Sequence, residues 1–330
     1  INIKGLISKI EYKQYKYENI NLDGEYKAGG YNGKIALNDP NGNVLLKGEF
    51  SPYNKIPNFN FTALISKIKP HNLNLSSKYS ETEFSLNINA NFHGKSINDL
   101  SGEVSVDSFI CKSATKDFYI PEIKISASNE DKNKKIEINS SFIKGTILGQ
   151  YSYETIGNSI TNILKKQVSS LASSTTNSQE KKLENNFNFD IHVYNTDILP
   201  ILLDIPLNIN SHSTIKGYVD DKMSRTRIEA YFPKLKYDNF NIESGVLICD
   251  NQGDQINAQI RFTNIRDNKN VINFSLDSKA KNDTLYTTLN WGNNSKNTYG
   301  GKLSAVTKFT RKINEVSQES NIATQIEIKA

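Results

Sequence analysis

Strict alternation of apolar and polar residues is the feature that most constrains this chain. Residues 84–92 carry Phe, Leu, Ile, Ala and Phe at every even position, with single polar residues between them. Side chains alternate between the two faces of a β-strand, so this pattern predicts one apolar face and one solvated face. Similar segments recur roughly every 8–15 residues along most of the sequence, which is the spacing of an all-β meander.

The composition agrees with a sheet that is apolar on only one side. Hydrophobic residues make up 37% of the 330 residues, and the mean hydropathy is −0.54. The 40 basic residues are nearly balanced by 35 acidic ones, and the lysines are scattered, so we expect no nucleic-acid partner. The chain begins at Ile1 and its only methionine is Met223, which suggests an internal or processed piece of a longer protein. Any membrane anchor or signal would then lie outside it.

The number of predicted strands limits the architecture. About twenty strands at a spacing of roughly 4.8 Å would extend on the order of 95 Å. Open twisted sheets seldom exceed about ten strands without curling or splitting. Two solutions remain: the apolar faces meet in a sandwich, or the sheet curls lengthwise into an apolar trough. The predicted fold class is therefore mainly β, a long and mostly antiparallel sheet curled into a trough, with one amphipathic helix.

The helix is predicted where the period changes from two residues to that of one helical face. Its apolar positions are Ile156, Ile160, Ile163, Leu164, Val168 and Leu171. A linker rich in Ser, Thr, Asn and Gln follows it. The predicted organisation is a first sheet segment at 1–153, a helix and linker at 154–186, and a second sheet segment at 187–330. The helix is expected to pack on a sheet end or to lie across the trough as a cover.

Three shorter features also yield expectations. Residues 39–43 carry Asp, Pro, Asn and Gly, which predict a hairpin turn. Residues 63–75 fit either a strand or a short helix, and residues 197–206 predict a short helical turn. Cys111 and Cys249 are expected to be free, buried thiols rather than a disulfide.

No arrangement of residues predicts catalysis. The four histidines are far apart, and the sequence contains no metalloprotease, zinc-finger, nucleophile-elbow or phosphate-loop motif. Asp190 and His192 share one strand face and could begin a metal or acid–base site, but such a pair more often belongs to a solvated polar face, since every neighbouring strand has one. We therefore predict no catalytic residue, no metal, no cofactor and no enzymatic activity.

The order of several motifs resembles that of the TamB family of translocation and assembly module proteins, in particular its form from Bacteroidota. The matching segments are residues 15–48, 187–189, 196–200, 205–207, 215–217, 232–237, 282–291 and 298–301. This resemblance implies a periplasmic envelope protein, anchored in the inner membrane by a segment not present here. It also implies a β-sheet trough, shared with AsmA-like proteins, that moves phospholipid toward the outer membrane. The implied partner is an Omp85-type, TamA-like outer-membrane protein.

Combining the alternation with the resemblance predicts a non-enzymatic lipid conduit that supports outer-membrane biogenesis. Phospholipid acyl chains would contact the inward residues, whose alternative role is an ordinary sandwich core. The predicted groove lining is Phe84, Leu86, Ile88, Phe92, Ile136, Ile138, Phe189, Ile191, Ile256, Ile260, Ile272, Phe274, Leu276, Leu285 and Leu289.

Two other functions remain open from the sequence. One is a periplasmic module that assists assembly or secretion of β-barrel and autotransporter proteins by pairing its exposed sheet edges with their strands. The other is a surface β-sandwich that binds carbohydrate or another partner. For the second, Tyr12, Tyr15 and Tyr17 form the only dense aromatic group, and they are equally suited to be ordinary strand residues.

Overall fold

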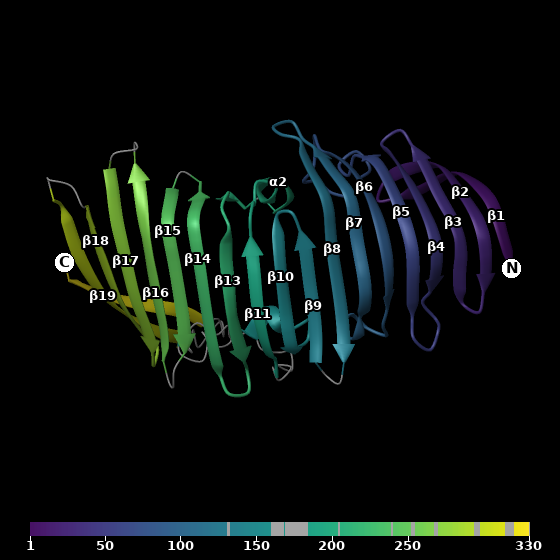
Figure 1. Ribbon diagram of the computed structural model, residues 1–330. Helices are drawn as coiled ribbons and strands as arrows, with labels where there is room; N and C mark the ends of the chain where they lie inside the picture. The colour runs from purple at the N-terminus through teal and green to yellow at the C-terminus, as the bar shows by residue number, and fades with distance from the viewer. Residues whose placement is uncertain are drawn as a thin grey trace. The chain divides into compact units, whose positions relative to one another are not determined.

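The mainly β fold class is confirmed by the computed structural model (Figure 1), whose strands form a twenty-stranded antiparallel sheet. The chain divides into two compact units, Ile1–Lys144 and Gly145–Ala330. The boundary lies within strand β10 (Ile143–Gln150), slightly before the predicted end of the first segment at residue 153. The structure describes residues 1–130, 133–159, 168, 184–203, 205–238, 240–251, 255–266, 270–293, 298–313 and 320–329.

Unit 1 is a meander in which each strand from β1 to β8 pairs antiparallel with the next strand along the chain. A 3-10 turn, η1 (Ile97–Asp99), connects β6 to β7. The predicted turn at residues 39–43 joins β3 to β4, which confirms that hairpin. The strands are β1 (Asn2–Tyr12), β2 (Tyr15–Lys27), β3 (Gly30–Asp39), β4 (Gly42–Ser51), β5 (Asn58–Ile68), β6 (Glu83–His93), β7 (Ser101–Lys112), β8 (Phe118–Glu130) and β9 (Asn133–Ser140).

Unit 2 is a second meander with one local exception. Strand β11 pairs with β13, while the short β12 pairs with the far end of β14, and from β13 onward each strand pairs with the next. The strands are β11 (Asn186–Val193), β12 (Leu207–Ile209), β13 (Ser213–Asp220), β14 (Arg225–Tyr237), β15 (Phe240–Asn251), β16 (Ile256–Arg266), β17 (Asn270–Lys281), β18 (Thr284–Asn293), β19 (Gly300–Ile313) and β20 (Ser320–Lys329).

The strand register places the alternating apolar residues of each unit on a single face. In unit 1, Ile88 of β6 lies opposite Ala63 of β5 and Val106 of β7. In unit 2, Ile260 lies between Leu247 of β15 and Leu276 of β17. Directly paired residues share a face, so these two sets define what we call the apolar face of unit 1 and the apolar face of unit 2. The opposite side of each sheet is its polar face.

Bulges keep the long strands of unit 1 in phase. The register shifts on both sides of β6, between Ile65 and Ile68 of β5 and between Ser85 and Asn87 of β6. Lys67 and Ser108, at these shifts, have φ of 53° and 54°. Each extra residue returns the alternation to the same face beyond the shift, and each bulge bends its strand and increases its twist, which favours curling of the sheet.

The secondary structure of the two irregular segments, residues 63–75 and 197–206, differs between them. Residues 63–75 are the end of a strand, since β5 continues to Ile68, followed by a turn in which the Leu73 amide donates to the Lys69 carbonyl at 3.1 Å. Residues 197–206 contain the helix α2 (Leu199–Leu203), which confirms the predicted helical turn.

The predicted amphipathic helix is only partly within the described residues. Residues 156–159 are helical, Ile156 is half-buried and Val168 is 5% exposed. The positions Ile160, Ile163, Leu164 and Leu171 lie outside the described residues, so the role of this segment as a cover stays a prediction. None of the helices among the described residues is long and apolar enough to span a membrane.

Candidate functional site

The apolar face of unit 1 remains accessible to solvent. The predicted lining residues on β6 (Phe84, Leu86, Ile88 and Phe92) and on β9 (Ile136 and Ile138) are all half-buried. The fully buried apolar side chains among the described residues of this unit are only Ala63, Leu73, Ala90, Cys111 and Ile120. The inner face of a closed sandwich would instead be packed to the density of a protein core. This face is therefore not packed like the inside of a closed sandwich.

The apolar face of unit 2 is similar over most of its area. The register brings most of the predicted lining residues into adjoining cross-strand rows, and they are half-buried: Phe189, Ile191, Ile260, Ile272, Phe274, Leu276, Leu285 and Leu289. Ile256 differs from the prediction, since it is only 5% exposed and cannot contact a ligand on the open face.

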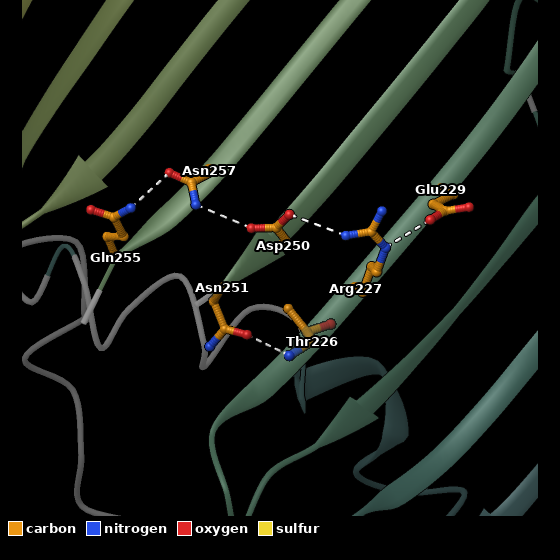
Figure 2. A network of polar contacts seen from close by, with 7 residues as sticks. All are labelled: Thr226, Arg227, Glu229, Asp250, Asn251, Gln255 and Asn257. Atoms are coloured by element: carbon orange, nitrogen blue, oxygen red, sulfur yellow. Dashed lines mark hydrogen bonds and ion pairs between the residues drawn. The ribbon is translucent and has the colours of Figure 1, made fainter. Parts of the chain in front are cut away.

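Ile256 belongs to a closed row at one end of this face. The row crosses six strands from β11 to β17, and each member is at most 7% exposed. The two polar members of the row form a hydrogen bond with each other, in which the Thr226 backbone amide donates to the Asn251 side chain (Figure 2). At the β11 end of the row, Tyr151 packs edge-on against Phe187 at a ring-centroid distance of 5.9 Å. The row consists of Phe187, Val219, Thr226, Asn251, Ile256 and Ala280.

Aromatic rings from neighbouring strands stack along both apolar faces. In unit 1 the ring centroids of Phe59 and Phe92 are 5.0 Å apart, with an interplanar angle of 22°. In unit 2 those of Phe262 and Phe274 are 4.9 Å apart, at 18°. Stacked rings add about 0.5–1.5 kcal/mol beyond their buried area. These pairs therefore add to the stability of both faces.

Some aromatic rings lie next to a glycine on the neighbouring strand. The alternation of the sequence did not predict this pairing. A Cβ on Gly217 would lie 2.9 Å from Cζ of Phe189, and one on Gly301 would meet the ring of Trp291. Both rings thus lie flat over the backbone of the neighbouring strand, as in aromatic rescue of a strand glycine. Flat rings keep the face shallow at these positions. The signal in the sequence was the set of glycines inside otherwise regular strands.

The polar face of unit 2 carries a network that crosses strands β14 to β16 (Figure 2). Nε of Arg227 donates to Glu229 at 2.7 Å, and its Nη1 contacts Asp250 at 3.4 Å. Asn257 donates to the other oxygen of Asp250 at 3.1 Å and accepts from Gln255 at 3.2 Å. The hydrogen bond from Arg227 lowers the pKa of the Glu229 carboxyl below its usual value. A general base would need the opposite shift, so this network stabilises a solvated surface.

Asp190 and His192 lie beside another histidine, His212, which is 20 residues further along the chain. Nε2 of His192 lies 3.2 Å from Asp190, and its Nδ1 lies 2.8 Å from Nε2 of His212. The ring of Tyr194 stacks on His212 at 4.9 Å. The β11–β13 register, which pairs Val193 with Ser213, creates this cluster on the polar face. Across the described residues, no three His, Cys, Asp or Glu side chains form a group able to hold a metal ion.

The two cysteines are free, as the sequence predicted. Cys111 is fully buried and Cys249 is half-buried, and they lie in different units. Burial raises the pKa of both thiols, and the neighbouring Asp117 and Asp250 raise them further. Both residues lie on apolar faces, opposite Phe84 and Ile228 respectively.

Two of the three tyrosines near the N-terminus hold a turn in place, while Tyr12 is 57% exposed. The hydroxyl of Tyr15 donates to Asp39 at 2.5 Å, and that of Tyr17 donates to the Leu73 carbonyl at 2.9 Å. Asp39 also accepts from the Asn41 amide at 2.9 Å. Because these hydroxyl groups are used within the protein, they provide no argument for a carbohydrate site.

Comparison with protein-family models, with curated proteins and with solved structures gives no match.

Proposed function

We propose that the chain binds lipid acyl chains along the apolar faces of its two units and serves as a non-enzymatic lipid conduit. The observation that carries this proposal is the half-burial of Ile88, Ile260 and their neighbours on long, regularly paired strands. Soluble proteins rarely leave contiguous apolar surface of this kind without an occupant. An acyl chain suits it, since hydrocarbon needs burial and no directed hydrogen bonds.

The energetics favour loose, sliding contact. Burial contributes about 0.8 kcal/mol per CH₂ group, so even partial contact along an acyl chain amounts to several kcal/mol. The described residues of both faces are mainly Ile, Leu, Val and Phe, with few polar side chains to fix one position. Such a surface would hold many acyl chains with little discrimination and with shallow barriers to movement.

The resemblance to the TamB family supplies the proposed setting. In that setting the protein lies in the periplasm of a cell envelope, its parent is anchored in the inner membrane, and phospholipid moves toward the outer membrane. An Omp85-type, TamA-like protein would be the outer-membrane partner.

Site-specific photocrosslinking tests the proposal. A photoreactive residue at Ile88 or Ile260 should capture phospholipid in cells, since both side chains lie on the apolar face of their unit. The matched control positions are Asn89 and Gln259, which are exposed on the polar faces of the same strands. Adducts with protein alone at both apolar positions would overturn the conduit.

The unpaired sides of the outermost strands favour a second function. Among the described residues, β1 pairs only with β2 and β20 pairs only with β19. Ile326 and Ile328 of β20 are 57% and 61% exposed. Such edges could accept a strand from a client outer-membrane protein. The substitution Leu86→Glu separates the two functions, because it should reduce lipid binding at the apolar face of unit 1 and leave client binding intact.

A further inference from the structure

Two histidines on the polar face of unit 2 have ring nitrogens that face each other. Nδ1 of His192 lies 2.8 Å from Nε2 of His212, and the interplanar angle of the two rings is 22°. The β11–β13 register pairs Val193 with Ser213, so the residues before them, His192 and His212, are diagonal neighbours on the opposite face. The sequence by itself predicted no metal, and it is the register that brings His212 to the pair.

Asp190 prepares His192 to act as a metal ligand. Its Oδ1 atom lies 3.2 Å from Nε2 of His192, which is the ring nitrogen that does not contact His212. A carboxylate at this position accepts the proton of Nε2 and thereby leaves the lone pair of Nδ1 available. Histidines that bind metal ions in proteins almost always have such a partner on the other ring nitrogen.

The ring of His212 is held by a neighbouring aromatic side chain. Tyr194 stacks on it with a ring-centroid distance of 4.9 Å and an interplanar angle of 14°. The stack fixes the plane of the imidazole, so that its Nε2 stays directed toward His192. Both histidines are therefore oriented in advance, which lowers the cost of ordering them around a ligand.

The geometry suits an ion with nitrogen ligands and open positions. Two nitrogens bound to one tetrahedral zinc ion lie about 3.3 Å apart, so the rings need to separate by only about 0.5 Å. Because no third ligand is present among the described residues, water would complete the coordination shell. The site is open to water, since the side chain of His192 is 36% exposed and His212 is also exposed. Imidazole ligands favour transition metals, whereas Mg²⁺ and Ca²⁺ prefer oxygen.

We propose that His192 and His212 bind a divalent transition-metal ion such as Zn²⁺, with Asp190 as a positioning residue. The two ligands lie at the ends of the segment between β11 and β13, which carries α2 and β12. A bound ion would close this segment like a clip and stabilise it. The site lies on the polar face, so metal binding is separate from the proposed binding of acyl chains.

The test titrates Zn²⁺ into the purified chain and follows binding by calorimetry. The unmodified protein should bind one Zn²⁺ and should not bind Mg²⁺. His192→Gln and His212→Gln should each weaken the affinity about 100-fold or more, since each removes a ligand, and Asp190→Asn should weaken it about tenfold. Asp190 is exposed, so Asp190→Asn should leave urea unfolding in the presence of EDTA unchanged, which separates positioning of the ligand from support of the fold.

The matched control is His71→Gln with His93→Gln, which removes two exposed histidines from unit 1 and should leave the affinity unchanged. Circular dichroism checks that every variant is folded. Unaltered Zn²⁺ affinity in both His192→Gln and His212→Gln, or a loss in the control, would show an adventitious ion only and overturn the site. No binding by the unmodified protein would overturn it as well.

Hydrogen exchange tests the clip. Zn²⁺ should slow exchange at α2 and β12 in the unmodified protein, and should leave exchange in β16 and β17 unchanged. The same measurement with His212→Gln should show no effect of Zn²⁺. Equal exchange at α2 and β12 with and without bound Zn²⁺ would overturn the closing of this segment by the ion.

Discussion

Gly102 of β7 illustrates how single residues shape the apolar face of unit 1. Its φ is 137°, and an added Cβ would lie 2.5 Å from the Cα of Phe92 on the neighbouring strand. Glycine is the residue that adopts this conformation without strain, and it also lets the two backbones approach closely. The alternation of the sequence marked Phe92 as apolar, but only the register showed that its partner must be glycine.

We predict that Gly102→Ala destabilises the protein by about 2–4 kcal/mol, since backbone strain and a steric clash act together. Urea or thermal unfolding measures the loss. Gly5→Ala is the matched control, because an added Cβ there meets nothing within 4 Å. Equal stability of the two variants would contradict the close approach at Gly102.

The thiol of Cys249 reports occupancy of the apolar face of unit 2. Because burial raises its pKa, less thiolate is present at neutral pH than for an ordinary cysteine. Its alkylation should be slow at pH 7 and accelerate about tenfold per pH unit below the pKa, while fully buried Cys111 stays unreacted. Bound phospholipid should slow modification of Cys249, as peptide mapping by mass spectrometry would show. An unchanged rate at saturating lipid would contradict acyl binding over this residue.

Among the elements, the segment that follows β10 is fastened to the sheet by buried hydrogen bonds. The Oδ2 atom of Asp221, in the β13–β14 turn, accepts from the Ser159 hydroxyl at 2.7 Å and from the Asn185 amide at 3.0 Å. Asn185 also donates to Ser159 at 2.7 Å, and both residues are almost completely buried. This polar cluster fixes the helical residues 156–159 at the closed end of the apolar face of unit 2.

We predict that Asp221→Ala lowers the free energy of unfolding by about 2–3 kcal/mol, because it leaves buried donors unsatisfied. Hydrogen exchange should show the largest increase at residues 151–159. Asp23→Ala removes an exposed carboxylate from the polar face of unit 1 and should change stability by less than about 0.5 kcal/mol. Uniform exchange across the unit would show that the cluster does not hold this segment in particular.

At the scale of the whole molecule, each of the two units has an apolar face of its own strands. Ile88→Glu places a charge on one face and Ile260→Glu places one on the other. If the faces bind acyl chains independently, each substitution should remove about half of the bound lipid and the double variant nearly all of it. Lipid extraction followed by mass spectrometry gives the stoichiometry, and circular dichroism confirms that the sheets remain folded.

The charge controls for this experiment are Asn89→Glu and Gln259→Glu, on the polar faces of the same strands. They should leave the amount of lipid unchanged. Full lipid content in the double variant would exclude the apolar faces as the binding surface. Complete loss in either single variant would show instead that the two faces bind as one.

The sequence by itself determined the β class, the face of each strand and most of the apolar residues, because a period of two fixes which side chains share a face. Residues 84–92 became β6 with its apolar positions on one side, and the turns at 39–43 and 197–206 were also correct. The tertiary structure decided which side chains are buried and which residues from different strands lie close together. It removed Ile256 from the open face and joined His192 to His212. These relations depend on which residues of different strands are paired and on how deeply each side chain is buried, and alternation within one strand determines neither.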